Sequence, residues 1–189
     1  MKSLIEIEKY ALDNYVPIIR KDNIEYLENL IKEKKLYRIL ELGSAIGYSS
    51  IRMALANENV RVTTIERDEK MYNEAIKNIN DFNLNDRINV IFDDIFNVEI
   101  TNKFDLIFID AAKAQYIKFF NKFKVNLTDK GYIISDNLEL LDLQRLTQSK
   151  RSKRLVTKMN EYKEFLNSLE DYKTEYLDIG DGFAITRRV

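Results

Sequence analysis

Residues 37–66, which read YRILELGSAIGYSSIRMALANENVRVTTIE, decide the fold. They begin with an apolar run, turn through Gly43 and Gly47, continue with apolar residues at helical spacing from about 48 to 57, and end in a second apolar run. A strand, a helix and a second strand in this order form a βαβ unit, in which the two strands lie parallel. Because both runs are apolar on both faces, we expect helices to cover each side of the sheet.

The alternation of apolar runs and amphipathic stretches continues along the chain beyond this unit. It predicts an α/β fold with a doubly wound, mostly parallel sheet of about seven strands, similar to the Rossmann fold. The expected strands of the parallel part are 37–42, 60–66, 88–92, 104–110 and 131–136. The expected helices between and after them are about 48–57, 68–82, 114–126 and 150–168.

The two ends of the chain depart from this alternation. Apolar residues at helical spacing predict two leading helices, at 3–14 and 22–34, and Pro17 enforces an extended break between them. At the other end, two strand-like segments, 172–179 and 182–189, are joined only by a short glycine-containing turn. Such a turn is far too short for a parallel crossover, so these segments are expected to form an antiparallel hairpin.

Length and composition are typical of one soluble domain. With 189 residues, of which 45% are hydrophobic, we expect a single domain over 1–189, with N-terminal helices in 1–34 and an α/β core in 37–189. No apolar run approaches the roughly 18 to 20 residues that a membrane span requires, and the N-terminus carries acids where a secretory signal is apolar. We therefore expect a cytoplasmic protein without a membrane partner.

The residue types that are missing exclude several kinds of chemistry. The chain has no cysteine and no histidine, which excludes disulfides, thiolate and imidazole metal ligands, and the commonest general base. Any catalyst must therefore be a carboxylate, a lysine, a tyrosine or a metal-bound group. The formal net charge is −1, so binding of a nucleic acid would require a local basic patch.

A cofactor site is expected where the first two strands end. The turn between Gly43 and Gly47 leads into a helix whose free N–H groups favour a polar or anionic ligand group. Glu66 ends the second strand about 20 residues later, which is the offset at which an acid binds ribose hydroxyls. Together these residues indicate a nucleoside-containing cofactor. The alternative is that the glycines serve only the turn and that Glu66 is a solvated strand end.

The details of this turn favour S-adenosylmethionine over a dinucleotide. Dinucleotide-binding turns need glycine at the second position of G-x-G-x-x-G so that the backbone approaches a pyrophosphate, and here that position is Ala45. S-adenosylmethionine contains adenosine but no phosphate, so Ala45 is compatible with it. Near the end of the third strand, Asp94 is a candidate for binding the adenosine. Asp93 competes for this role, and a simple turn aspartate is a further alternative.

Polar residues also end the fourth and fifth predicted strands. Asp110 closes the fourth strand and Lys113 follows it, whereas Asp136 and Asn137 close the fifth. If the two strands are neighbours, two carboxylates and an amide oxygen lie together, a set that suits a hard cation such as Mg²⁺. The alternative is that Asp110 caps a helix, that the Asp-Asn pair begins a turn, and that Lys113 is a surface residue.

The chain resembles the metal-dependent O-methyltransferases of the catechol and caffeoyl-coenzyme A type in four segments: ELGSAIGYSSIRMA, TIERDE, FDLIFIDAAK and GYIISDN. IERDEK, DAAKAQY and IISDN, together with YVPII and GDGFAITRR, resemble the bacterial branch that methylates 5-hydroxyuridine in tRNA. The resemblance extends over about residues 10 to 189. It implies a class I methyltransferase fold, S-adenosylmethionine as the methyl donor, a divalent cation such as Mg²⁺, and a homodimer.

The resemblance also assigns roles to individual residues. It implies that Asp110, Asp136 and Asn137 hold the metal. It further implies that Lys113 accepts the proton of the substrate hydroxyl, so Lys113 and Asp110 are the expected catalytic residues. The residues at the positions that bind the cofactor in this family are Val16, Glu41, Gly43, Ser49, Glu66, Asp94 and Asp110.

The substrate implied by the resemblance has a hydroxyl beside a second oxygen. 5-Hydroxyuridine offers its 5-hydroxyl next to the C4 carbonyl, and the expected product is 5-methoxyuridine at the wobble position of tRNA. Two departures from the family pattern concern the site: Asp93 replaces a usual glycine, and LELLDLQRL after Asn137 differs from the apolar segment that borders the substrate. A small catechol-like phenol is the alternative substrate, and a cofactor-binding module without catalysis is the alternative function.

A basic segment after the fifth strand is the candidate contact with the anticodon region of tRNA. The alternative is a solvated face of a helix. Tyr15 and Tyr48 are candidates to stack on the base. The basic residues expected to contact the RNA are Arg145, Lys150, Arg151, Lys153, Arg154 and Lys158.

Overall fold

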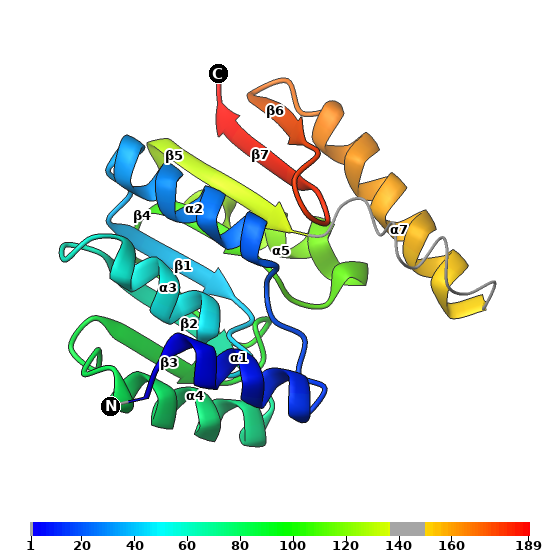
Figure 1. Ribbon diagram of the computed structural model, residues 1–189. Coiled ribbons are helices and arrows are strands. Elements are labelled where there is room, and N and C mark those ends of the chain that lie inside the picture. The colour runs from blue at the N-terminus through cyan, green and yellow to red at the C-terminus, as the bar shows by residue number, and fades with distance from the viewer. Residues whose placement is uncertain (1, 137–149) are drawn as a thin grey trace.

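The computed structural model of the chain describes residues 2–136 and 150–189. Its strands are β1 (Arg38–Leu42), β2 (Arg61–Glu66), β3 (Ile88–Phe92), β4 (Phe104–Ile109), β5 (Leu127–Asp136), β6 (Tyr172–Leu177) and β7 (Phe183–Arg188). They form one sheet in the order β3-β2-β1-β4-β5-β7-β6 (Figure 1). The first five strands pair in parallel, and β7 lies antiparallel between β5 and β6.

Helices cover both faces of this sheet (Figure 1). The helical elements are α1 (Leu4–Asp13), α2 (Lys21–Lys34), α3 (Tyr48–Ala56), α4 (Glu69–Asp81), the 3₁₀ turn η1 (Lys113–Gln115), α5 (Tyr116–Phe123), the 3₁₀ turn η2 (Lys124–Asn126) and α7 (Lys150–Asn167). In β4, Leu106 and Phe108 join the core that contains α1, α2 and α3, whereas Ile107 and Ile109 join the core that contains α5 and α7. Successive side chains of a strand point to opposite faces, and both faces are buried here. The doubly wound α/β fold is therefore confirmed.

The segment 114–126, predicted as one helix, is instead divided between η1, α5 and η2. The helix ends early because Asn126 is buried and donates from Nδ2 to two backbone carbonyls of the loop before β4, at 2.8 and 2.9 Å. The next strand also begins earlier than the predicted 131–136, since Leu127 already pairs with Phe104 of β4. Sequence periodicity does not reveal either contact, because both join segments that are distant along the chain.

The predictions for the two ends of the chain are confirmed. Two helices precede β1, and β6 pairs antiparallel with β7. In the turn between these strands, Gly180 and Gly182 have φ angles of +56° and +82°, in the left-handed region where a residue without a side chain is unstrained. Within the described ranges, no helix has the length and apolar character needed to cross a membrane.

The N-terminal helices are fastened to α3 by a polar network. The Tyr48 hydroxyl donates to Glu8 of α1 at 2.5 Å, and Arg52 donates to both carboxylate oxygens of Glu28 in α2, at 2.5 and 3.0 Å. Arg52 also donates to the Tyr48 hydroxyl at 2.8 Å. Tyr48 is only 2% exposed, so its interpretation as a base-stacking residue is wrong. Tyr15, which is 94% exposed, remains a candidate.

Replacing Phe120 by alanine is expected to destabilise the fold strongly. The ring is 1% exposed and packs edge to face against Phe165 of α7 and Tyr172 of β6, with ring centroids 5.4 and 5.5 Å apart. We expect Phe120→Ala to lower the free energy of unfolding by about 3–5 kcal/mol, because it leaves a cavity in the core. Urea denaturation measures this change. The control Val125→Ala alters an exposed side chain and should cost less than about 0.5 kcal/mol; equal costs for the two variants would contradict the assignment.

Candidate active site

A cavity of about 450 Å³ opens at the carboxyl ends of the parallel strands. This is the edge at which ligands bind to doubly wound sheets. The residues after β1, β2, β3 and β4 form most of its wall. Residues 17–19, which precede α2, and Asp181 in the β6–β7 turn complete it.

The turn after β1 brings its backbone against the end of β4. Gly43 has φ of +98°, and a Cβ atom at this position would lie 2.6 Å from the backbone oxygen of Asp110. Gly47 begins α3 with φ of +79°, so the helix N-terminus faces the turn without a side chain. Both glycines are therefore required for the shape of the cavity wall, whatever ligand it holds.

Glu66 lies at the end of β2 in a fixed orientation. Its Oε2 accepts from the backbone N–H of Ala45 at 2.9 Å, and its Oε1 accepts from the N–H groups of Arg67 and Asp68 at 2.9 and 2.8 Å. Both Ala45 and Glu66 line the cavity. A carboxylate whose two oxygens are held by backbone donors beside the cavity suits the acceptance of hydrogen bonds from neighbouring hydroxyl groups.

Glu41 is a buried acid that lies behind the cavity wall. It is fully buried in β1 and accepts hydrogen bonds from the Ser49 hydroxyl at 2.5 Å and from the Ser50 hydroxyl. Burial raises the pKa of Glu41 to about 7, and the hydrogen bonds from the two serines oppose this shift only in part. Ser49 itself lines the cavity, so a ligand there acts on Glu41 through this hydroxyl.

Asp110 and Asp136 lie at neighbouring strand ends, as the sequence led us to expect. β4 and β5 pair in parallel, with Ile109 opposite Ser135, so the two aspartates follow side by side. Asp136 is fully buried, and its Oδ1 accepts from Nδ2 of Asn23 at 2.7 Å. Burial raises the pKa of Asp110; Lys113 opposes this shift and Asp181 adds to it.

These residues fit a hard divalent cation in their chemistry. Two carboxylates follow adjacent strands where burial makes uncompensated negative charge costly, and oxygen ligands suit Mg²⁺ or Mn²⁺. Among the described residues, no group of three or more acidic, cysteine or histidine side chains is arranged to hold a metal ion. Asn137, the third predicted ligand, lies outside the described residues.

Lys113 begins η1 and lines the same cavity as Asp110. The two residues are close enough for the lysine charge to act on the Asp110 carboxyl. The turn η1 also contacts α7. The structure therefore places an acidic and a basic side chain on one wall of the cavity.

The remaining predicted cofactor residues occupy different environments. Asp94 lines the cavity, whereas Asp93 does not and instead accepts hydrogen bonds from within its own turn. Asp94 accepts from the Phe96 backbone N–H at 2.9 Å and pairs with Arg67 at 3.0 Å, and these contacts lower its pKa. Val16 is buried in the core, and the three residues after it line the cavity instead.

Sequence reasoning missed three residues of this site. Arg20 pairs with Asp181 at 2.8 Å beside the cavity, and Asn23 contacts Asp136 from α2. One signal for Asn23 was available, since it occupies the apolar stripe of its helix, in line with Leu27. A buried asparagine among apolar residues requires a polar partner. No sequence signal linked Arg20 to Asp181, because they lie at opposite ends of the chain.

The raised pKa of Glu41 predicts a specific dependence of stability on pH. Between its ordinary value of 4.5 and about 7, the folded protein keeps a proton on Glu41 that the unfolded chain has lost. The free energy of unfolding should therefore fall as pH rises through this window, by about 3 kcal/mol in total at 1.36 kcal/mol per pKa unit. The difference between wild type and Glu41→Gln in urea denaturation isolates this contribution. A difference that stays constant from pH 4.5 to 8 would show that Glu41 titrates normally.

Comparison with known proteins identifies the family. A family model described as O-methyltransferase matches residues 1–189. A caffeoyl-CoA O-methyltransferase of Populus kitakamiensis is 30% identical over 89% of this chain and 77% of its own length. A catechol O-methyltransferase of Niastella koreensis is 34% identical over 60% of this chain and 55% of its own length.

Solved structures resemble the chain as well. A Staphylococcus aureus protein provisionally assigned as a caffeoyl-CoA O-methyltransferase has a crystal structure with a TM-score of 0.91 and 33% identity, covering 100% of this chain and 93% of that one. A Bacillus cereus O-methyltransferase solved with S-adenosylhomocysteine has a TM-score of 0.82 and 26% identity, covering 100% and 92%. The chain therefore belongs to the O-methyltransferase family, among the S-adenosylmethionine-dependent enzymes of the caffeoyl-CoA and catechol type.

Proposed function

We propose that this enzyme methylates the 5-hydroxyl of wobble 5-hydroxyuridine in tRNA to give 5-methoxyuridine, with a divalent cation, most simply Mg²⁺, at Asp110 and Asp136. The observation that carries the proposal is that two acids follow adjacent strand ends, with Lys113 beside Asp110 in the cavity wall. The 3₁₀ turn η1, which Lys113 begins, contacts the basic helix α7. Asn137 is proposed as the third metal ligand from its position in the sequence.

S-adenosylmethionine would occupy the part of the cavity that lies at the carboxyl ends of β1 and β2. Glu66 would accept hydrogen bonds from the ribose hydroxyls, and Asp94 would lie beside the adenosine. Ser49, backed by Glu41, would receive the methionine end next to Gly43. In this orientation the methyl group would lie toward Asp110 and Lys113, which also line the cavity.

The reaction requires removal of one proton and transfer of one methyl group. A bound divalent cation would lower the pKa of the substrate hydroxyl and fix its orientation. Lys113, in its unprotonated form, takes up the hydroxyl proton at Nζ. The substrate oxygen then forms a bond to the methyl carbon while the bond from that carbon to sulfur breaks, which yields S-adenosylhomocysteine. Holding the acceptor oxygen and the methyl carbon in line within the cavity would supply much of the rate.

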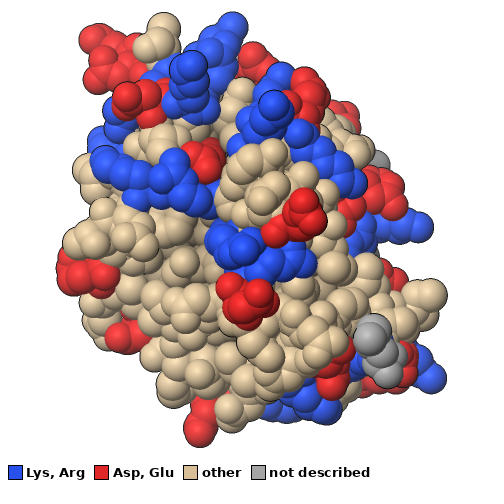
Figure 2. All heavy atoms as spheres, turned by 90° about the vertical axis from the view of Figure 1, so that its left-hand side faces the viewer, with Lys and Arg blue, Asp and Glu red and all other residues tan. Residues whose placement is uncertain are grey.

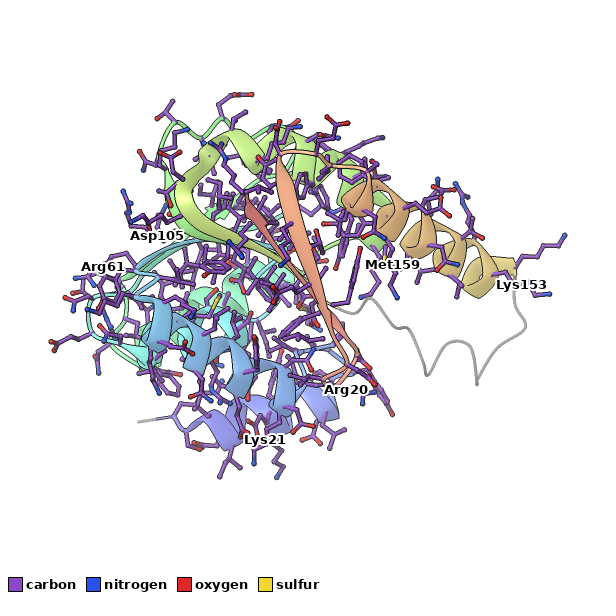
Figure 3. The ribbon with its side chains drawn as sticks, turned by 90° about the horizontal axis from the view of Figure 1, so that it is seen from above. Arg20, Lys21, Arg61, Asp105, Lys153 and Met159 are labelled. Carbon is purple, nitrogen blue, oxygen red and sulfur yellow. The ribbon has the colours of Figure 1, made fainter. Side chains whose placement is uncertain are left out.

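The charge distribution supports RNA as the substrate. Lys150, Lys153 and Arg154 are exposed near the start of α7, whereas Lys158 pairs with Glu161 at 2.6 Å. Lys153 points away from the body of the protein (Figure 3). The face at the other ends of the parallel strands carries interspersed basic and acidic side chains (Figure 2). Arg145 and the side chain of Arg151, also predicted to contact RNA, lie outside the described part of the chain.

A small catechol-like phenol is the second candidate substrate. The relatives named above include a catechol and a caffeoyl-CoA O-methyltransferase, and both names describe phenolic acceptors. The cavity volume of about 450 Å³ is also in the range of small-molecule sites. Such a substrate would use the same acidic pair and Lys113 but would not need α7.

Methyl transfer to tRNA that contains 5-hydroxyuridine tests the chemistry. We expect 5-methoxyuridine to form with Mg²⁺ present and to be lost after chelation, and to recover when Mg²⁺ is restored. Lys113→Ala should lower kcat by about 10²–10⁴-fold with little change in S-adenosylmethionine affinity, because it removes the general base. Mass spectrometry of digested tRNA measures the product, and calorimetry measures the affinity. Full turnover in chelator, or by Lys113→Ala, would reject this mechanism.

Charge reversal on α7 separates the two substrates. The double variant Lys153→Glu, Arg154→Glu should reduce kcat/KM for tRNA about tenfold or more and lower the slope of log affinity against log salt by about 2, since each phosphate contact contributes about 1. Turnover of free catechol should not change. The control Lys32→Glu, Lys130→Glu makes the same change in net charge at exposed positions away from α7. Equal effects of the two double variants would argue against RNA contact through α7.

A further inference from the structure

The first turn of α2 lies between the β6–β7 turn and the buried end of β5. Arg20 precedes this helix and lies at the tip of the β6–β7 hairpin (Figure 3), where its Nε pairs with Asp181 Oδ2 at 2.8 Å. One helical turn away, Asn23 is fully buried and donates from Nδ2 to Oδ1 of Asp136 at 2.7 Å. A residue from the N-terminal part of the chain thus contacts one of the two acids of the candidate metal site.

The other side of the Asn23 amide is fixed by close packing. A Cβ atom at Gly180 would lie 1.8 Å from Asn23 Oδ1, so the β6–β7 turn accommodates the asparagine only because residue 180 has no side chain. Gly180 also has φ of +56°. The amide therefore lies between the turn and the Asp136 carboxylate, to which its Nδ2 donates. A side chain that is fixed in this way can fix its partner in turn.

We propose that Asn23 is a positioning residue that orients the Asp136 carboxylate for a divalent cation. A carboxylate rotates about its Cβ–Cγ bond unless donors hold its oxygens, and metal ligands depend on such partners for their orientation. Asn23 is neutral, so it fixes one oxygen without competing with a cation for the negative charge. The proposal rests on the metal dependence of the proposed function and adds a residue that touches neither substrate nor cofactor.

The same helix also connects this contact to the cavity. Residues 17–19, which line the cavity, end one residue before Arg20 and only a few residues before Asn23. Movement of this segment would therefore pull on the donor of Asp136. The alternative is that Asn23 only satisfies a buried carboxylate for the stability of the fold. Metal affinity distinguishes these roles, because stability alone does not change the affinity of the folded protein for a cation.

Direct binding of Mn²⁺ tests the proposal without an activity assay. Electron paramagnetic resonance of free Mn²⁺ gives the dissociation constant for wild type, Asn23→Ala and the control Asn29→Ala, an exposed asparagine of the same helix. We expect Asn23→Ala to weaken Mn²⁺ binding about 10- to 100-fold, as for other partners of metal ligands. S-adenosylmethionine affinity should stay within about twofold in all three proteins. Unchanged Mn²⁺ affinity in Asn23→Ala, or an equal loss of both ligands, would overturn the proposal.

Wild-type binding separates the inference from the proposed function. A wild-type protein that binds no Mn²⁺ refutes the metal dependence and the inference together. Mn²⁺ binding that is equal in wild type and Asn23→Ala refutes only the role of Asn23.

A second variant tests the packing by itself. Gly180→Ala should displace the Asn23 amide and weaken Mn²⁺ binding in the wild-type background, but have little further effect in Asn23→Ala. The strain from φ of +56° is common to both backgrounds and cancels in this double-mutant cycle. Additive losses would contradict the contact.

Discussion

Two acidic side chains lie at the adjacent, buried ends of β4 and β5, and burying their negative charge costs free energy. Neighbouring groups of the site compensate this cost. Parallel pairing fixes the two backbones side by side. Burial then raises the pKa of Asp110, and the charge of Asp181 raises it further. Such carboxylates ionise readily only where positive charge or donors compensate them. Lys113 and the proposed cation supply positive charge, and the amide of Asn23 supplies a hydrogen-bond donor.

The donor site and the acidic pair are not independent of each other. The turn after β1 passes so close to the backbone of Asp110 that only glycine fits at residue 43. The same turn offers the N–H of Ala45 to Glu66, which lies on the next strand. A displacement of this turn would therefore alter Glu66, the acid proposed to bind the ribose, and the Asp110 backbone together. Close coupling of this kind suits an enzyme that must hold a methyl donor within bonding distance of the acceptor oxygen.

The sequence was sufficient for the fold but not for every contact of the site. Alternating apolar runs depend on local periodicity, and they predicted the parallel core, the leading helices and the hairpin. The division of 114–126 depends on the Asn126 amide, which reaches a distant loop. The contacts of Asn23 and Asp181 could not be predicted for the same reason, because each has its partner far away along the chain. Tyr48 was misjudged because its ring belongs to the core shared with the N-terminal helices, where its hydroxyl donates to Glu8.

The start of α7 carries charge of the sign that a helix tolerates least there. A helix N-terminus bears partial positive charge, and acidic residues in the first turn usually stabilise it by about 0.3–1 kcal/mol each. α7 has none in its first turn and instead begins with Lys150 and other basic residues. At the amino ends of the parallel strands, by contrast, a basic side chain has an acidic partner, since Arg38 pairs with Asp105 at 2.8 Å. Salt screens charges that lie more than about 8–10 Å apart. Distant charges of the protein therefore do not offset the repulsion between these basic residues and the positive end of the helix. A phosphate group placed here would neutralise both the basic side chains and the helix end. The charge at the start of α7 therefore disfavours the helix by itself and suits the RNA contact proposed above.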